Sequence, residues 1–228
     1  MRLNADFDAM TIVHGGRLPW RQSPVVGVER RMVYREGEET ARATTIVRYA
    51  PGSAFPRHVH GGGEEILVLE GVFQDEHGDY PAGAYFRNPP GTAHEPASGT
   101  GCTLFVRLWQ FNRDDDIQTV RQPYEGAPGP LSSGVAESRT LFESADETVR
   151  LERWEAGAER ILEDSRGLEL LVVSGRLSTE TDSLEAQAWL RLPAGVALSI
   201  VVGEEGAQIW LKRAPLIPAS PCGLSEAS

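Results

Sequence analysis

The 228-residue sequence contains only two cysteines, Cys102 and Cys222, which lie far apart and form no Cys-x-x-Cys pair. This scarcity excludes a disulfide framework and a cysteine-rich zinc finger, and it is typical of a reducing compartment. No apolar run approaches the roughly 18 residues of a membrane-spanning helix, and the first residues contain no apolar signal segment. We therefore expect a cytoplasmic protein.

The sequence also has fewer basic than acidic residues. The chain has 22 Lys and Arg against 33 Asp and Glu, a formal net charge of -11. Such a balance repels phosphate backbones and anionic lipids, so we expect neither nucleic acid nor membrane as a partner. Hydrophobic residues make up 40% and charged residues 24%, which is typical of a globular chain and excludes wholesale disorder.

Apolar residues mostly alternate with polar ones, a period of two that is typical of strands. Residues 44–49, 65–70 and 103–109 read as strands, and breaks such as Pro51-Gly52 and Pro89-Pro90-Gly91 separate strands of this kind. Many short strands with turn residues between them predict an all-β fold, a barrel or sandwich.

The two halves of the chain align without a gap when Gly71 is placed on Gly175 and Gly91 on Gly195, an offset of 104 residues. Matching turn residues and apolar strands predict two copies of one β unit. We therefore expect an N-terminal domain at 1–113, a polar, proline-rich linker at 114–134 and a C-terminal domain at 135–228.

Three of the five histidines and one glutamate form a candidate metal site. His58 and His60 lie two residues apart, so on a strand their imidazoles share a face. Glu64 follows a glycine turn, and His94 follows the Pro89-Pro90-Gly91 turn. Three nitrogens and one carboxylate suit Zn, Fe, Mn, Ni or Co rather than Ca or Mg. The other two histidines, His14 and His77, are expected at the surface or in loops.

The spacing around these residues resembles the two motifs of the cupins. The first is Gly52-x5-His58-x-His60-x3-Glu64-x6-Gly71, and the second is Gly83-x5-Pro89-x-Gly91-x2-His94, with Ser98 where the family usually has Asn. The resemblance implies two tandem double-stranded β-helix (jelly-roll) barrels. It also implies one metal in the N-terminal barrel, bound by His58, His60, Glu64 and His94.

Glu65 competes with Glu64 as the ligand, but adjacent strand residues point to opposite faces, so only one of them can face the metal. Glu65 has a counterpart in Glu169 of the second half, whereas Glu64 falls on Leu168. Because a carboxylate that is kept in both halves is expected to be structural, we expect Glu64 to be the ligand. It is also the candidate catalytic base.

The second half lacks the candidate ligands. At the same offset its residues are Leu162, Asp164, Leu168 and Leu198. Leucine cannot coordinate a metal, so we expect the C-terminal barrel to be a metal-free, structural or partner-binding copy.

The run from His58 to Gly83 is more specifically similar to the ChrR-type cupins, named for a bacterial anti-sigma factor. That resemblance implies zinc, with iron, nickel or manganese as alternatives, and a part in the response to oxidants. In the family a separate N-terminal helical domain with a His/Cys motif carries the anti-sigma activity. The first residues here lack such cysteines, so we do not expect that activity.

Two functions stay open. In one, the protein is a sensor or binding module for a small molecule or oxidant, with a regulatory protein as partner and a homodimer as one oligomeric state to test. In the other, it is an Fe(II)-type cupin dioxygenase that acts on a small chelating ketone or related carbonyl compound. Tyr85, Phe86 and Trp109 are candidate pocket residues in either case.

Overall fold

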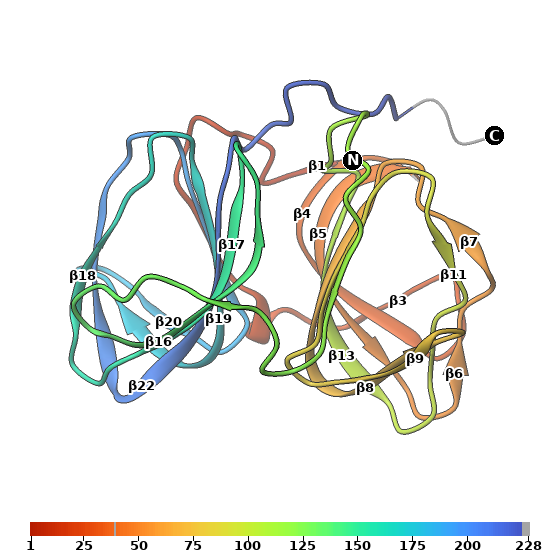
Figure 1. Cartoon of the computed structure of the whole chain (residues 1–228), viewed down its shortest axis with the longest axis horizontal. Coiled ribbons are helices and arrows are strands. Elements are labelled where there is room, and N and C mark those ends of the chain that lie inside the picture. The colour runs from red at the N-terminus through yellow and green to blue at the C-terminus, as the bar shows by residue number, and fades with distance from the viewer. Residues whose placement is uncertain (39, 225–228) are drawn as a thin grey trace. The chain divides into compact units, whose positions relative to one another are not determined.

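The computed structural model describes residues 1–38 and 40–224, and these divide into two compact units. The first unit comprises Met1–Ala5, Pro19–Tyr124 and residues 217–224, and the second comprises Asp6–Leu18 and Glu125–Leu216. Both units are built from strands (Figure 1), and the second also contains one short 3-10 helix, η1 (Gly15–Arg17). The prediction of an all-β fold is confirmed.

The first unit has a main sheet with the order β1-β4-β5-β13-β8-β10-β14, and a separate pair of short strands, β7 and β11. All paired strands in it are antiparallel. Its strands are β1 (Arg2–Leu3), β3 (Arg21–Gln22), β4 (Val28–Gly37), β5 (Ala41–Tyr49), β6 (Ser53–Ala54), β7 (His58–Val59), β8 (Glu64–Asp75), β9 (Gly78–Pro81), β10 (Tyr85–Asn88), β11 (Ala93–His94), β12 (Ala97–Ser98), β13 (Cys102–Leu108) and β14 (Thr119–Arg121).

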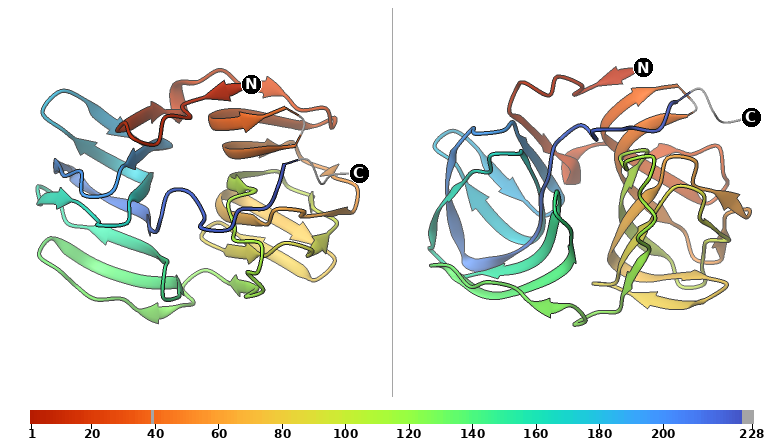
Figure 2. Two further views of the ribbon diagram at one scale, coloured as in Figure 1. Left: turned by 90° about the horizontal axis from the view of Figure 1, so that it is seen from above. Right: turned by 45° about the horizontal axis from the view of Figure 1, so that its top comes forward.

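The second unit has the order β15-β16-β17-β22-β19-β21-β2, with β18 on β22 and β20 on β19. Its strands are β2 (Thr11–His14), β15 (Ala127–Pro128), β16 (Val135–Glu143), β17 (Thr148–Trp154), β18 (Glu159–Leu162), β19 (Leu168–Ser178), β20 (Ser183–Glu185), β21 (Ala188–Leu192) and β22 (Leu198–Arg213). In Figure 2 the strands of each unit curve around a common interior.

Equivalent strands of the two units pair in the same register, as expected of an internal repeat. His58 pairs with His94 across β7 and β11, and at an offset of 104 Leu162 pairs with Leu198 across β18 and β22. The turn glycines also correspond. Gly71 and Gly175 have left-handed φ angles of 71° and 81°, and at each a Cβ would lie 2.1 Å from a carbonyl oxygen. Only glycine fits such a position.

The boundaries of the units differ from the predicted ranges 1–113, 114–134 and 135–228. Strand β2, inside the first range, pairs with β21 of the second unit, and β14, inside the predicted linker, pairs with β10 of the first. Residues 217–224 belong to the first unit, where Pro221 forms a bridge with Asn112. Edge strands offer unpaired backbone groups, and these distant segments cover them. Residues 225–228 of the last range lie outside the described residues.

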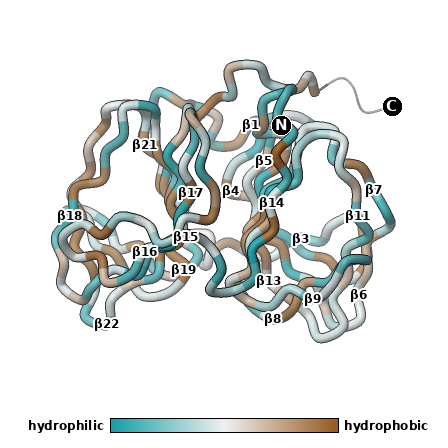
Figure 3. Tube along the Cα trace, in the orientation of Figure 1, coloured by the Kyte–Doolittle hydropathy of each residue, from teal (hydrophilic) through white to brown (hydrophobic). Residues whose placement is uncertain are grey.

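The interiors of the two units are filled differently. Figure 3 shows hydrophobic and hydrophilic residues interspersed along the chain of both units. In the second unit the inward residues form a continuous apolar core, including Leu168, Leu170, Leu190 and Ile209, all fully buried. In the first unit the inward faces of β4, β5, β8 and β13 line a cavity. The described residues contain no helix with the length and apolar character needed to span a bilayer.

Candidate metal centre

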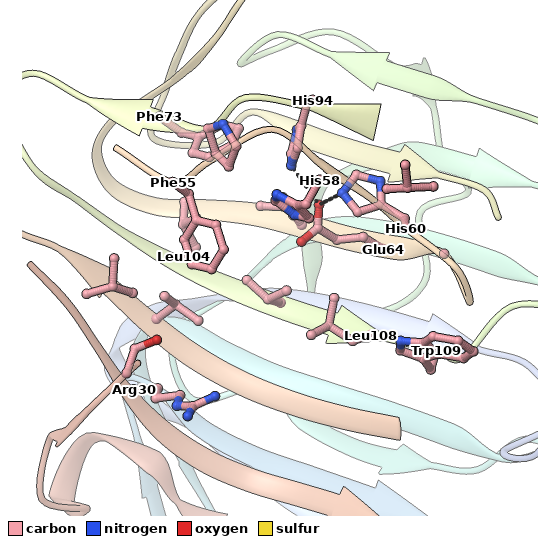
Figure 4. A pocket seen from close by; sticks show the side chains of 18 of the residues that line it. Arg30, Phe55, His58, His60, Glu64, Phe73, His94, Leu104, Leu108 and Trp109 are labelled. Atoms are coloured by element: carbon pink, nitrogen blue, oxygen red, sulfur yellow. Dashed lines mark ion pairs between the residues drawn. The ribbon is translucent and has the colours of Figure 1, made fainter. Parts of the chain in front are cut away.

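Short strands bring the four candidate ligands together at one end of the first unit. His58 begins β7, His60 follows it, Glu64 begins β8 and His94 ends β11. Antiparallel pairing of β7 with β11 sets His58 opposite His94. Each residue offers a ligand atom, and these atoms all lie within 4.8 Å of one another. Figure 4 shows the three imidazoles and the carboxylate pointing toward one another.

The atoms at the centre of this cluster have no hydrogen-bonding partner. Nε2 of His60 lies 3.1 Å from Oε2 of Glu64, and Nε2 of His94 lies 3.4 Å from the same oxygen (dashed in Figure 4). All three atoms are buried, and none makes a hydrogen bond of acceptable geometry. Buried polar atoms left in this way are costly. A bound cation would satisfy all of them at once, so the residues fit a metal.

The opposite ring nitrogens are occupied. Nδ1 of His58 lies 3.0 Å from the Pro56 carbonyl oxygen, and Nδ1 of His60 lies 3.0 Å from the Thr92 hydroxyl oxygen. That hydroxyl donates to the Pro89 carbonyl at 2.7 Å, so it accepts from His60. With the proton held on Nδ1, the Nε2 lone pair points to the centre, the arrangement that orients imidazole ligands around metals.

A carboxylate lies near the other ring nitrogen of His94. Nδ1 of His94 lies 3.8 Å from Oδ2 of Asp75, whose side chain is almost fully buried. The other Asp75 oxygen accepts from the Tyr80 hydroxyl at 3.2 Å and from the backbone N–H of His77 at 2.8 Å. At 3.8 Å the contact with His94 is longer than a hydrogen bond, so Asp75 acts on the ring through its negative charge.

The protonation states suit coordination. Burial raises the pKa of the Glu64 carboxyl, but the facing imidazoles, His60 first, outweigh it and hold that pKa below its usual value. Burial lowers the pKa of His94 more than the Glu64 charge raises it. Glu64 is thus ionised and His94 neutral at neutral pH, as metal ligands must be. Three imidazole nitrogens and one carboxylate suit a divalent transition metal.

The turn that joins His60 to Glu64 is packed against an indole. A Cβ on Gly62 would lie 2.3 Å from two ring atoms of Trp109, and one on Gly61 would lie 2.9 Å from the same ring. The Trp109 backbone N–H donates to the Gly63 carbonyl at 3.0 Å. Trp109 itself has a left-handed φ of 59°, which is strained for a bulky residue. The glycines are therefore needed for the close approach of Trp109 as well as for flexibility.

A cavity of about 650 Å³ opens beside the four candidate ligands (Figure 4). Apolar side chains form most of its wall, and Trp109 lies on it as expected of a candidate pocket residue. Phe86 instead lines a second, more polar cavity of about 410 Å³ behind His60 and His94. Tyr85 lines neither cavity, and its hydroxyl donates to Glu65 at 2.6 Å.

Glu64 and Glu65 face opposite ways, as strand alternation requires. Glu64 belongs to the metal cluster, while Glu65 is 2% exposed and accepts hydrogen bonds from Tyr85 and Arg107. Its counterpart Glu169 accepts from the Trp189 indole N–H at 3.2 Å. The glutamate present in both halves thus holds neighbouring strands together.

The counterparts of the ligands in the second unit form no site. Leu162 and Leu168 are buried in its apolar core, Leu198 packs against that core, and Asp164 pairs with Arg166. Within the part of the chain that the structure describes, the only cluster able to hold a metal is the one in the first unit.

The remaining histidines lie outside the cluster. His14 is on β2 of the second unit, and its Nε2 is 3.1 Å from Asp182, so it is partly buried rather than fully at the surface. His77 is an exposed turn residue between β8 and β9. Its side chain lines the second cavity.

Thr92 and Asp75 contact two of the candidate ligands, and the sequence alone did not single them out. Thr92 lies inside the second motif, between Gly91 and His94. Its hydroxyl, two residues before a candidate ligand, was the sequence signal that could have identified it. Asp75 is 19 residues before His94 in the chain, so only the fold brings the two together.

Comparison with known families gives one match. Residues 8–112 match the ChrR cupin-like domain. No curated protein matches the chain.

Solved structures resemble the whole chain. A putative dioxygenase from Nostoc punctiforme has a TM-score of 0.72 at 12% identity, covering 94% of this chain and 86% of that one. The bacterial pirin YhhW from Escherichia coli, in complex with nickel(II), has a TM-score of 0.64 at 15% identity, covering 92% and 100%. The oxalate decarboxylase of Lactobacillus farciminis, in a formate complex, has a TM-score of 0.62 at 12% identity, covering 90% and 86%. At such identities the likeness shows the fold, and the predicted pair of tandem jelly-roll barrels is confirmed.

Proposed function

We propose that the first barrel of this chain, whose residues 8–112 match the ChrR cupin-like domain, binds one divalent transition metal and holds a small organic molecule against it, as a sensor or binding module. The observation that carries the proposal is the set of buried, unpartnered atoms of His60, Glu64 and His94 beside an apolar cavity. Such a cavity with a few convergent polar groups is the usual form of a small-molecule site.

The roles of the residues follow from their surroundings. His58, His60 and His94 would hold the metal through Nε2, and Glu64 would supply the anionic oxygen. A bound metal would act as a Lewis acid for oxygen-donor ligands, with redox chemistry added if it is iron. The apolar wall would exclude water and bind the body of the ligand by burial of its surface.

The first test is metal content. The purified protein should carry close to one transition metal per chain, and the double variant His58→Ala with His60→Ala should carry almost none. The matched control is His14→Ala with His77→Ala, which removes two histidines outside the cluster and should leave the metal content unchanged. Two metals per chain, or full occupancy in the first double variant, would contradict the single-site proposal.

We propose zinc as the resident metal, on the strength of the ChrR-like match. The measurement is elemental analysis of protein isolated without added metal. Zinc favours sensing, whereas iron would favour oxygen chemistry; nickel or manganese would point to other cupin reactions.

A dioxygenase is the second candidate function. It is supported by the position of the cavity directly beside the candidate ligands, and by the similarity to a protein described as a putative dioxygenase. Fe(II)-loaded protein should then consume O₂ with a β-diketone or hydroxyketone, and Glu64→Gln should change the rate. No consumption across a broad panel, together with a specific regulatory partner recovered by pull-down, would favour the sensor.

A further inference from the structure

The mostly apolar wall of the cavity beside the candidate metal ligands contains one cationic side chain, that of Arg30. Inward-facing residues of β4 alternate along the strand, so Val28 and Arg30 face the cavity together, as does Val47, the cross-strand neighbour of Arg30 on β5. Apart from the metal cluster, Arg30 is the charged residue of this lining. Figure 4 shows it apart from the cluster, with Leu104 and Leu108 between them in that view.

The Arg30 guanidinium is uncompensated. No described side chain forms a hydrogen bond or an ion pair with it, although it is only partly exposed. Its direct cross-strand neighbour on β3 is Arg21, another cation. Like charges placed directly opposite on neighbouring strands destabilise the pair. Arg35 is a second nearby cation: burial lowers its pKa, the charge of Arg30 lowers it further, and the Glu38 carboxylate raises it.

With a divalent metal bound at the proposed site, the cavity would be positive within a chain of net charge -11. A divalent metal carries more charge than the single Glu64 carboxylate neutralises, and Arg30 adds a further positive charge at a separate place. Walls of low polarity strengthen the interaction of such charges with a ligand. An arginine fork matches a carboxylate group in a bidentate manner.

We propose that Arg30 forms an anion-binding subsite of the cavity. The ligand of the first barrel is then a small carboxylic acid with an apolar body, which coordinates the metal with oxygen atoms at one end and pairs its carboxylate with Arg30 at the other. This inference rests on the proposed metal site and names the class of molecule that the site takes.

The probes that test it are monohydroxamates of linear dicarboxylic acids, compared with their methyl esters. The hydroxamate group chelates a divalent metal through two oxygens, and a series of chain lengths finds the one that spans the cavity. Binding to zinc-loaded protein is measured by calorimetry, with the metal content of each sample determined alongside.

At the best chain length the free acid should bind about tenfold or more tightly than its methyl ester, the size expected for hydrogen bonds to a charged group. Arg30→Met should remove this preference without changing metal content or ester affinity, and Arg30→Lys should keep part of it. Arg31→Met is the matched control, because Arg31 packs over the Trp20 ring, outside the cavity lining, at 4.1 Å. This variant should keep the full preference.

The outcomes separate two failures. If neither the acid nor the ester binds to zinc-loaded protein, the open metal centre of the proposed function is wrong. If both bind but the acid has no advantage at any chain length, or Arg30→Met keeps the advantage, the metal site stands and the anion subsite is refuted.

Discussion

Replacing Gly62 by alanine puts a methyl group where the Trp109 indole already lies. The new Cβ would be 2.3 Å from Cδ2 and Cε3 of that ring, well inside the contact distance of about 3.5–4.0 Å. The indole cannot withdraw freely, because the Trp109 N–H is bonded to Gly63 and its backbone is already in a left-handed conformation. The overlap must therefore displace the turn that carries His60 and Glu64.

Overpacking of this kind typically costs about 1–3 kcal/mol, and we expect Gly62→Ala to lower the free energy of unfolding by that amount. Because the displaced turn carries two of the four candidate ligands, we also expect metal affinity to fall about tenfold or more, the equivalent of about 1.4 kcal/mol. Denaturant unfolding of the metal-free protein measures the first effect, and competition with a chromophoric chelator measures the second.

Two variants control the experiment. Gly99→Ala adds a methyl group that meets only the end of the flexible Gln74 side chain at 3.2 Å, and should change little. Trp109→Leu in the Gly62→Ala background should restore much of the loss, with a coupling energy of about 0.5–3 kcal/mol. Wild-type behaviour of Gly62→Ala, or a double variant whose losses simply add, would refute the reasoning.

The remaining predictions concern the ligands and their supports. Glu64→Gln should lower metal content, while the metal-free protein unfolds much as before. Arg107→Met leaves the buried Glu65 carboxylate without its ion pair. That variant should lose about 3–5 kcal/mol of stability and keep the metal content of the folded protein unchanged. A reversed pattern would show that the two glutamates have been assigned the wrong way round. Thr92→Val removes the acceptor of the His60 Nδ1–H and should lower metal affinity about 10–100-fold with stoichiometry unchanged; equal affinities in a chelator titration would show that the hydroxyl does not orient the ring. Metal at 100 times its dissociation constant should stabilise the protein by about 2.7 kcal/mol, and thermal unfolding that ignores added metal would contradict a folded-state site.

Much of the candidate site could be predicted because strand geometry is local. Alternation of side chains along a strand puts His58 and His60 on one side and separates Glu64 from Glu65. Turn positions that admit only glycine, such as Gly71, mark the repeat because their backbone conformation is dictated by a close approach. The repeat in turn identified the leucine-filled second unit.

Other parts of the site depend on contacts between distant segments. The contact of Asp75 with His94 and the position of Arg30 in the cavity wall have no local spacing signal, because each depends on which hairpins surround the same interior. Trp109 was a candidate only as an aromatic residue near a strand end. Its packing on Gly61 and Gly62 depends on a left-handed backbone conformation that its sequence does not favour.

The sequence by itself determined the all-β architecture, the duplication and the four candidate ligands, since period-two patterning, turn glycines and motif spacing act over a few residues. Only the tertiary structure decided how the chain is divided between the units. Strand β2 pairs with β21, and residues 217–224 return to the first unit. Such pairings supply hydrogen bonds to the backbone groups of edge strands from segments far away in the chain. Because backbone hydrogen bonding does not depend on side-chain identity, no residue pattern predicts these pairings.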